Sequence, residues 1–131
     1  MTTAPALFGE RVLTLGPAST TPVRLSVLTP FHRHDPSPLL QAMARAPRDV
    51  EFILLDDGSG SAELLSNVIN AAAALAAPVR LIVWADNQGR AAGRNRLVAE
   101  ARGAYVLFLD ADMIPDAPDF LGRWLAVAET A

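Results

Sequence analysis

The sequence predicts an α/β fold of the Rossmann-like type, in which helices flank a mostly parallel sheet. The first observation is that apolar strand patterns alternate with amphipathic helix patterns from residue 23 to about residue 128. This order is typical of parallel sheets with right-handed crossovers. The second observation is an uninterrupted apolar run, Ala104 to Leu109, which predicts a strand buried on both faces. Because parallel strands end at one edge, the loops that follow them should meet there.

The position of each element is predicted from the spacing of its apolar residues and from the capping residues at its ends. Ser37, with Pro38 at the first helical position, predicts one helix start, and Ser61 predicts another. Pro47 should end the first of these helices, and Gly103 should end the third. The strands are predicted at residues 23–28, 50–55, 79–84 and 104–109, and Thr29-Pro30 should end the first of them. The helices are predicted at about residues 37–46, 61–77, 90–102 and 119–128.

Composition and charge exclude several classes of protein and of functional site. The chain has 131 residues, of which 51% are hydrophobic and 19% charged, as expected of one globular domain. A formal net charge of -3 argues against binding nucleic acid through bulk charge. The sequence contains no Cys and no Lys, which excludes disulfides, thiolate zinc sites, a cysteine nucleophile and a P-loop lysine.

The first part of the chain has no sustained period. Residues 1–22 are therefore expected to form a leader, and residues 23–131 the folded domain. Met1 to Gly16 lacks the basic start and apolar stretch of a signal peptide, so the cytoplasm is the expected location. No apolar run approaches the roughly 20 residues that span a bilayer, so no membrane span is expected.

Acidic residues follow three of the four predicted strands. Asp56-Asp57, Asp86 and Asp110-Ala111-Asp112 should all lie at the carboxyl edge of the sheet. A divalent cation with a diphosphate would offset their repulsion, because the cation binds carboxylates and the phosphates attract Arg90, Arg94 or Arg96. A lone D-x-D pair is also explained by ordinary turn chemistry.

Four motifs in order resemble the family 2 glycosyltransferases. They are Val27-Leu28-Thr29-Pro30, Ile53 to Ser59, Asn87 to Asn95, and Phe108 to Asp112, and the resemblance covers about residues 23 to 125. It implies the nucleotide-binding half of the GT-A fold and a nucleotide-diphospho-sugar donor, with a UDP-sugar as the first expectation. It also implies a divalent cation, Mn²⁺ or Mg²⁺.

The resemblance assigns roles residue by residue. Asp56 and Asp57 would face the base, and Thr29 and Pro30 would border the nucleoside. The other implied contacts to the nucleotide sugar come from Asn87, Gly89, Arg90, Arg94, Asp110 and Ala111, and Asp112 would reach the metal.

The implied reaction is inverting transfer of a hexosyl group to a carbohydrate or other hydroxyl acceptor. In the family, the general base follows the D-x-D strand by a long stretch of sequence, so no catalytic residue is assigned here. Asp116 and Asp119 fit helix capping better than catalysis. The isolated chain is therefore expected to bind the donor with little or no transfer.

Three alternatives remain open. A phosphoacceptor receiver domain shares the alternation of strands and helices, but the absence of Lys argues against it. A nucleotidyltransferase-like domain uses similar carboxylates, although the loop after Pro30 lacks its glycines. A non-catalytic interaction or oligomerisation module would bury Phe120, Trp124 and Leu125 in a partner or in a second copy, giving a homodimer. His32 and His34 are interpreted as an exposed polar loop rather than metal ligands.

Overall fold

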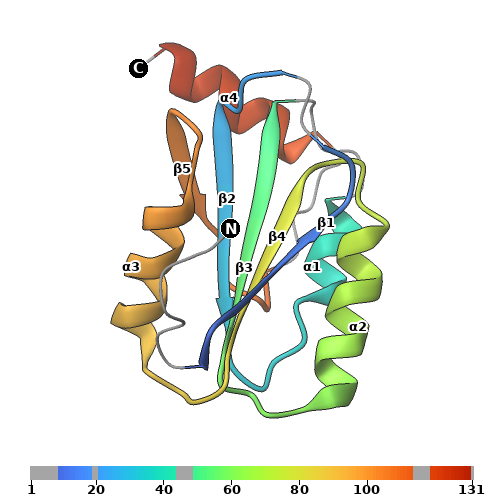
Figure 1. Ribbon diagram of the computed structural model, residues 1–131. Coiled ribbons are helices and arrows are strands. Elements are labelled where there is room, and N and C mark those ends of the chain that lie inside the picture. The colour runs from blue at the N-terminus through green and yellow to red at the C-terminus, as the bar shows by residue number, and fades with distance from the viewer. Residues whose placement is uncertain (1–8, 19–20, 44–48, 114–118, 131) are drawn as a thin grey trace.

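The sheet has five strands in the order β1-β4-β3-β2-β5 (Figure 1). The computed structural model describes residues 9–18, 21–43, 49–113 and 119–130. All pairings are parallel except that of β1 with β4, so the predicted α/β class with a mostly parallel sheet is confirmed. The elements are β1 (Arg11–Leu15), β2 (Leu25–Phe31), α1 (Ser37–Ala42), β3 (Val50–Asp57), α2 (Ala62–Ala73), β4 (Val79–Trp84), α3 (Arg90–Glu100), β5 (Tyr105–Phe108) and α4 (Phe120–Thr130).

Helices cover both faces of the sheet, because alternate residues of each central strand point to opposite sides. Leu28, Ile53 and Ile82 pack with Leu97 of α3 on one face. The other face is larger and is covered by α1, α2 and α4. Its core includes Val27, Phe52, Leu54, Leu81, Leu39, Val68 and Leu121. The continuous apolar runs of β3 and β4 therefore pack against helices on both faces of the sheet.

The strand β2 continues through Thr29-Pro30 to Phe31, so the predicted break at these residues is wrong. On the β3 side the pairing runs to Phe31, opposite Asp56. On the β5 side it stops at Leu28, opposite Phe108. Pro30 lies beyond that point, where its missing N–H costs no bond to β5.

Residues 11–15, within the expected leader, form β1. This strand pairs with all but the last residue of β4, from Arg11 opposite Val83 to Leu15 opposite Val79. Leu13 and Leu15 pack against the larger core. The β4 edge of the sheet is therefore paired along most of its length.

The strand β5 is not buried on both faces, and that prediction is wrong. Tyr105 and Val106 are 41% and 46% exposed. In the described part of the chain, β5 is an edge strand with β2 as its neighbour, which explains why its apolar residues remain accessible.

The capping predictions had mixed outcomes. Ser61 caps α2, since its Oγ accepts a hydrogen bond from the amide of Leu64, as predicted. Ser37 is instead the first residue of α1 and follows Pro36, so its predicted capping role is wrong. Gly103 does not end α3; the extended Ala101 is the C-cap residue, and Gly103, two residues later, donates its amide to Ser26 Oγ. Pro47 and Asp116 lie outside the described residues.

Among the residues whose structure is described, no helix is long and apolar enough to cross a membrane.

Candidate functional site

The loops at the carboxyl edge of the parallel strands form an open cleft of about 520 Å³. The last residue of β3, the loops after β2 and β4, and the turn after β5 all contribute to it, as the strand order requires. Eight of the residues expected to bind nucleotide sugar or metal line this cleft: Pro30, Asp57, Asn87, Gly89, Arg90, Asp110, Ala111 and Asp112. Asp57 and Asp112, which come from opposite sides of β2 in the sheet, thus border one common cavity.

Asp57, the last residue of β3, organises the neighbouring loop. Its side chain accepts hydrogen bonds from the amides of Gln88, at 2.7 Å, and Gly89, at 3.0 Å. Its carbonyl oxygen accepts one from Asn87 Nδ2 at 3.0 Å. Asp57 is only 6% exposed. Residues 85–89, which we call the donor loop, are therefore held to the end of β3 through both main chain and side chain.

Gly58 allows this close approach. It has a φ of +68°, in the left-handed region, and a Cβ placed there would lie 2.2 Å from the amide nitrogen of Asn87. A side chain would clash with backbone that has no freedom to rotate away. The glycine of the Asp56-Asp57-Gly58-Ser59 motif is thus required by the packing of two loops.

The start of α3 faces the cleft without a side-chain cap. Gly89 is the N-cap residue, and the first turn of the helix contains no acidic residue. Arg90, at the first helical position, is exposed and lines the cavity. Free amides at a helix start attract anions, and a guanidinium adds a full positive charge. This part of the cleft suits a phosphate group.

Asp110 and Asp112 lie on the turn after β5, on either side of the buried Ala111. The amide of Met113 donates to the Asp110 carbonyl at 3.0 Å, which closes the turn. Both side chains are exposed and line the cleft. The described residues contain no group of three or more His, Asp or Glu that could hold a metal by itself. Two carboxylate donors fit a divalent cation that takes its other ligands from phosphate and water.

Three expected site residues do not line the cleft. Thr29 is 1% exposed within β2. Asp56 is 3% exposed and accepts a hydrogen bond of 2.9 Å from the amide of Ser59, so it shapes its own turn. Arg94 places its guanidinium 3.9 Å from the centre of the Phe108 ring, a cation–π contact against β5.

The cleft is also lined by Phe31, His32 and His34, which the sequence did not mark as site residues. Both histidines are exposed, as expected of a polar loop. His32 Nδ1 donates a hydrogen bond of 2.7 Å to the Asp57 carbonyl, which has no proton of its own to give. The other ring nitrogen, Nε2, is therefore the one left to contact a ligand. The sequence does contain a signal for these three residues, since they closely follow Pro30, near the end of a predicted strand.

Comparison with known proteins gives a consistent result. The sequence profile of the family described as "Glycosyl transferase family 2" matches residues 26–130. A protein described as an uncharacterized glycosyltransferase from Haemophilus influenzae is 37% identical over 76 residues, which cover 56% of this chain and 29% of that protein.

A solved structure is similar to this chain as well. It is the mannosyltransferase PcManGT from Pyrobaculum calidifontis in complex with GDP-Man and Mn²⁺, with a TM-score of 0.63 and 27% sequence identity. The match covers 86% of this chain and 35% of the mannosyltransferase. The chain thus spans about a third of the length of either relative.

Proposed function

The chain belongs to glycosyl transferase family 2, and from this premise we propose that its cleft binds the nucleoside diphosphate part of a nucleotide-sugar donor together with a divalent cation. The observation that carries the proposal is the convergence of Asp57, Gly89, Arg90, Asp110 and Asp112 on one cavity. The similar mannosyltransferase was solved with GDP-Man and Mn²⁺, which supports the same class of ligand.

The positions of the charged groups suggest how the donor lies. Arg90 and the free amides at the start of α3 would bind the diphosphate. The nucleoside would extend along Pro30, Asp57 and Asn87, at the ends of β2, β3 and β4. The Asp57 carboxylate oxygens, each with a second lone pair, remain able to accept from a base N–H or a ribose hydroxyl.

Asp112, with Asp110 beside it, would hold the cation, which would supply positive charge at the diphosphate leaving group. Asp110 and Ala111 would also border the ribose. Mn²⁺ and Mg²⁺ both accept such oxygen ligands. The transferred sugar would be a hexose, and the acceptor a carbohydrate or another hydroxyl compound.

We further propose that transfer is inverting and that this chain alone binds the donor but transfers little. The described residues place carboxylates at the donor side of the cleft, where they would bind cation and nucleotide. An acceptor hydroxyl also needs a base within hydrogen-bond reach of its proton. Among the described residues, the carboxylates that line the cleft are Asp57, Asp110 and Asp112, to which we give roles in binding the nucleotide and the cation, so none is left for that base.

Isothermal titration calorimetry tests the proposal. GDP, UDP and ADP, each with Mn²⁺, with Mg²⁺ and with a chelator, should show cation-dependent binding of at least one nucleotide. A preference for GDP or for UDP would identify the base of the donor. The similarity to PcManGT, solved with GDP-Man, predicts guanine, whereas the sequence resemblance predicts uracil. Absence of heat for every nucleotide at millimolar concentration, with the protein folded by circular dichroism, would reject donor binding.

A second candidate function, assembly through an apolar surface, is favoured by exposed side chains on β5 and α4. Tyr105, Val106, Trp124 and Val127 are between 41% and 60% exposed. Of the three residues that the sequence placed in such an interface, Trp124 is exposed, but Leu125 is 5% exposed in the core of this chain and Phe120 packs against that core, so the expectation is wrong for these two. A homodimer burying these residues is the form that we propose for this alternative. Sedimentation velocity over a range of concentrations tests it, since a monomer at every concentration would exclude the homodimer.

A further inference from the structure

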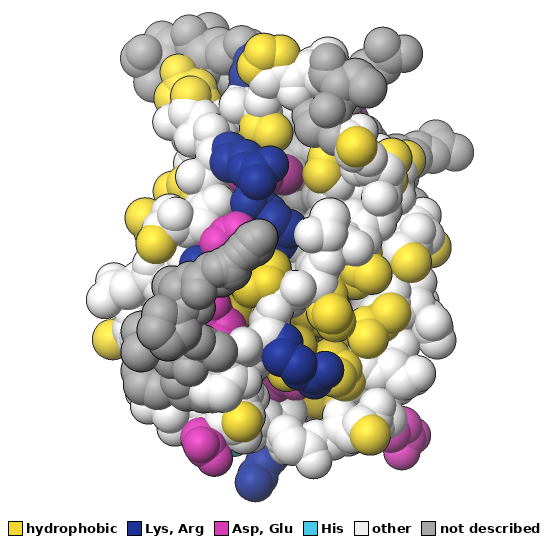
Figure 2. Space-filling view, viewed as in Figure 1, with side chains coloured by type: hydrophobic (Ala, Val, Ile, Leu, Met, Phe, Trp, Pro, Cys, Tyr) yellow, Lys and Arg dark blue, Asp and Glu magenta, His cyan; other side chains and the backbone are white. Residues whose placement is uncertain are grey.

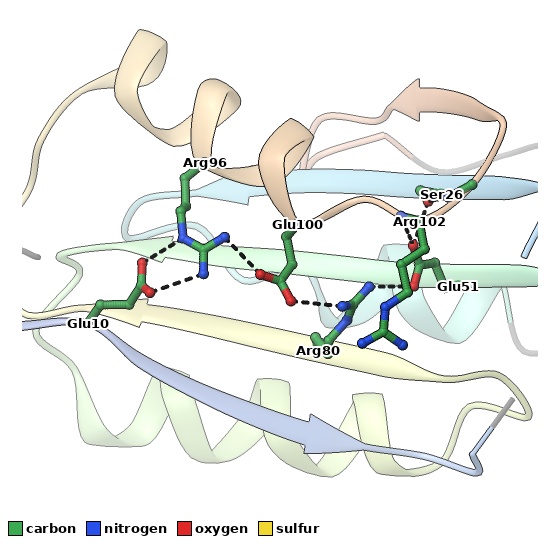
Figure 3. A network of polar contacts seen from close by, with 8 residues as sticks. Glu10, Ser26, Glu51, Arg80, Arg96, Glu100 and Arg102 are labelled. Atoms are coloured by element: carbon green, nitrogen blue, oxygen red, sulfur yellow. Dashed lines mark hydrogen bonds and ion pairs between the residues drawn. The ribbon is translucent and has the colours of Figure 1, made fainter. Parts of the chain in front are cut away.

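The carboxylate of Glu10 binds Arg96 of α3 (Figure 3), and it also binds Trp84 at the end of β4. Glu10 immediately precedes β1. Its Oε1 accepts hydrogen bonds from Trp84 Nε1 at 2.9 Å and from Arg96 Nε at 2.8 Å, and its Oε2 accepts from Arg96 Nη2 at 3.1 Å. Trp84 is the last residue of β4, and Arg96 lies in the second turn of α3. The donor loop connects these two elements.

Gly9 lies against the loop itself. It has a φ of +64°, and a Cβ placed on it would lie 2.8 Å from the Cβ of Ala85, the first residue of the loop. The adjacent strand β1 is fixed by its antiparallel pairing with β4. Trp84 is 3% exposed, so its N–H needs a partner within the protein. Residues 9–10 thus lie against the first residue of the donor loop and are bound to β4 and α3, the elements that the loop connects.

Arg96 is oriented from its other side by a chain of ion pairs between α3 and the sheet (Figure 3). Its Nη1 lies 2.8 Å from Glu100 Oε1, and Glu100 Oε2 lies 2.8 Å from Arg80 Nη1. Arg80 in turn pairs with the buried Glu51 of β3. On the face of the molecule that Figure 2 shows, Arg and acidic side chains lie next to one another along the middle. The guanidinium is therefore already positioned to receive Glu10 at little cost in side-chain entropy.

The charge on Glu10 is retained in the folded protein. Burial by itself raises the pKa of this carboxyl, but hydrogen bonds from Arg96 and Trp84 and the charge of Arg96 bring the pKa below its ordinary value. The hydrogen bond to Glu10 raises the pKa of Arg96 correspondingly. At neutral pH the contact is a pair of full charges.

We propose that Glu10 is a positioning residue for the donor loop: by binding Trp84 and Arg96 at once, it ties β4 to α3, the two elements that the loop connects, and so keeps Asn87, Gly89 and Arg90 at the cleft. This inference rests on the proposed donor binding. Glu10 lies outside residues 26–130, which match the family. The segment before the family domain would thereby set the affinity of the cleft.

The test compares E10Q with D49N by calorimetry with GDP and UDP in the presence of Mn²⁺. Asp49 pairs with Arg24 at the amino end of the parallel strands, far from the cleft along the sheet, and its loss controls for a missing part-buried ion pair. E10Q should bind nucleotide about five- to tenfold more weakly than the wild type, because a charged hydrogen-bond partner is lost while Asp57 still holds the loop. D49N should bind like the wild type, and E10D should recover part of the affinity.

A second readout needs no ligand. In E10Q, the indole N–H resonance of Trp84 should shift, and the amides of Gln88 and Gly89 should exchange with solvent faster, whereas D49N should leave both unchanged. If E10Q does not fold, W84F tests the same contact from the other side, since it removes the N–H and keeps a ring.

The outcomes separate the two proposals. If the wild type binds no nucleotide, donor binding fails, and the exchange rates of Gln88 and Gly89 alone decide the role of Glu10. If the wild type binds and E10Q matches it in affinity or in these exchange rates, the positioning role is overturned. Equal loss of affinity in E10Q and D49N would overturn it too, since that loss would reflect stability.

Discussion

The carboxylate of Asp57 accepts a hydrogen bond from the amide of Gly89, 32 residues further along the chain. Gly89 is the N-cap of α3, so the end of β3 fixes the place where this helix starts. A second hydrogen bond, from the amide of Gln88, prevents the carboxylate from rotating away. Asp57 thus positions the side of the cleft that would bind phosphate. It is the same residue to which the family resemblance assigns a contact with the base.

Replacing Asp57 with Asn should lower the free energy of unfolding by about 1.5–3 kcal/mol, because the part-buried amides of Gln88 and Gly89 lose a charged acceptor. The matched control is D86N, which changes an exposed acid of the donor loop and should stay within about 0.5 kcal/mol of the wild type. Urea denaturation measures both. Equal stabilities of D57N and D86N would contradict the proposed role of the two hydrogen bonds.

Gly58 and Gly60 form a second matched pair, with φ values of +68° and +67°. G60A should cost about 1–2 kcal/mol of stability from backbone strain alone, since nothing lies within 4 Å of the added Cβ. G58A should cost about 1–3 kcal/mol more, because the Cβ would meet the amide of Asn87. Thermal and urea unfolding of both variants check the difference, and an equal cost would show that the two loops can separate freely.

The D112N variant should weaken cation-dependent nucleotide binding by about tenfold or more, since it removes a charged oxygen ligand. Binding in the presence of a chelator should be weak and equal for variant and wild type. D119N is the control, because Asp119 is exposed and pairs with Arg123 on α4. Calorimetry with Mn²⁺ provides the comparison, and wild-type affinity in D112N would remove Asp112 from the metal site.

Stability should fall in acid partly through Glu10. Because the pKa of Glu10 is lower in the folded chain than its ordinary value of 4.5, the ionised carboxylate stabilises the fold above that value. This contribution is lost as pH falls through the folded pKa, below 4.5. E10Q should therefore be less stable than the wild type at neutral pH, and the gap should shrink in acid. Urea titrations from about pH 7 to about pH 3 measure the gap; a constant gap would contradict the ionic role.

Much of the fold could be predicted from sequence because its central elements are specified locally. Residues 79–84 form a strand as predicted, and Ser61 caps the helix that follows β3. The alternation of elements requires the strand ends to share an edge, which is why Asp57 and Asp112 meet at one cleft. Their distance in sequence did not matter, because the topology brings them together.

The remaining features depend on contacts that no local pattern contains. The strand β1 is five residues long and pairs with residues almost 70 positions later. Exposure of β5 depends on its place at the sheet edge, since its apolar sequence suits a central strand equally well. Arg94 lies on the expected helix, but its guanidinium contacts the Phe108 ring, and Arg94 is not among the described residues that line the cavity.

The two tryptophans differ in accessibility, Trp84 at 3% and Trp124 at 45% exposed. A water-soluble quencher such as acrylamide or iodide would therefore suppress the emission of Trp124 first. The residual fluorescence would come from the indole that ends β4, where Trp84 lies opposite Asp57, which lines the cleft. The chain carries its own optical probe of ligand arrival there, and no label has to be attached.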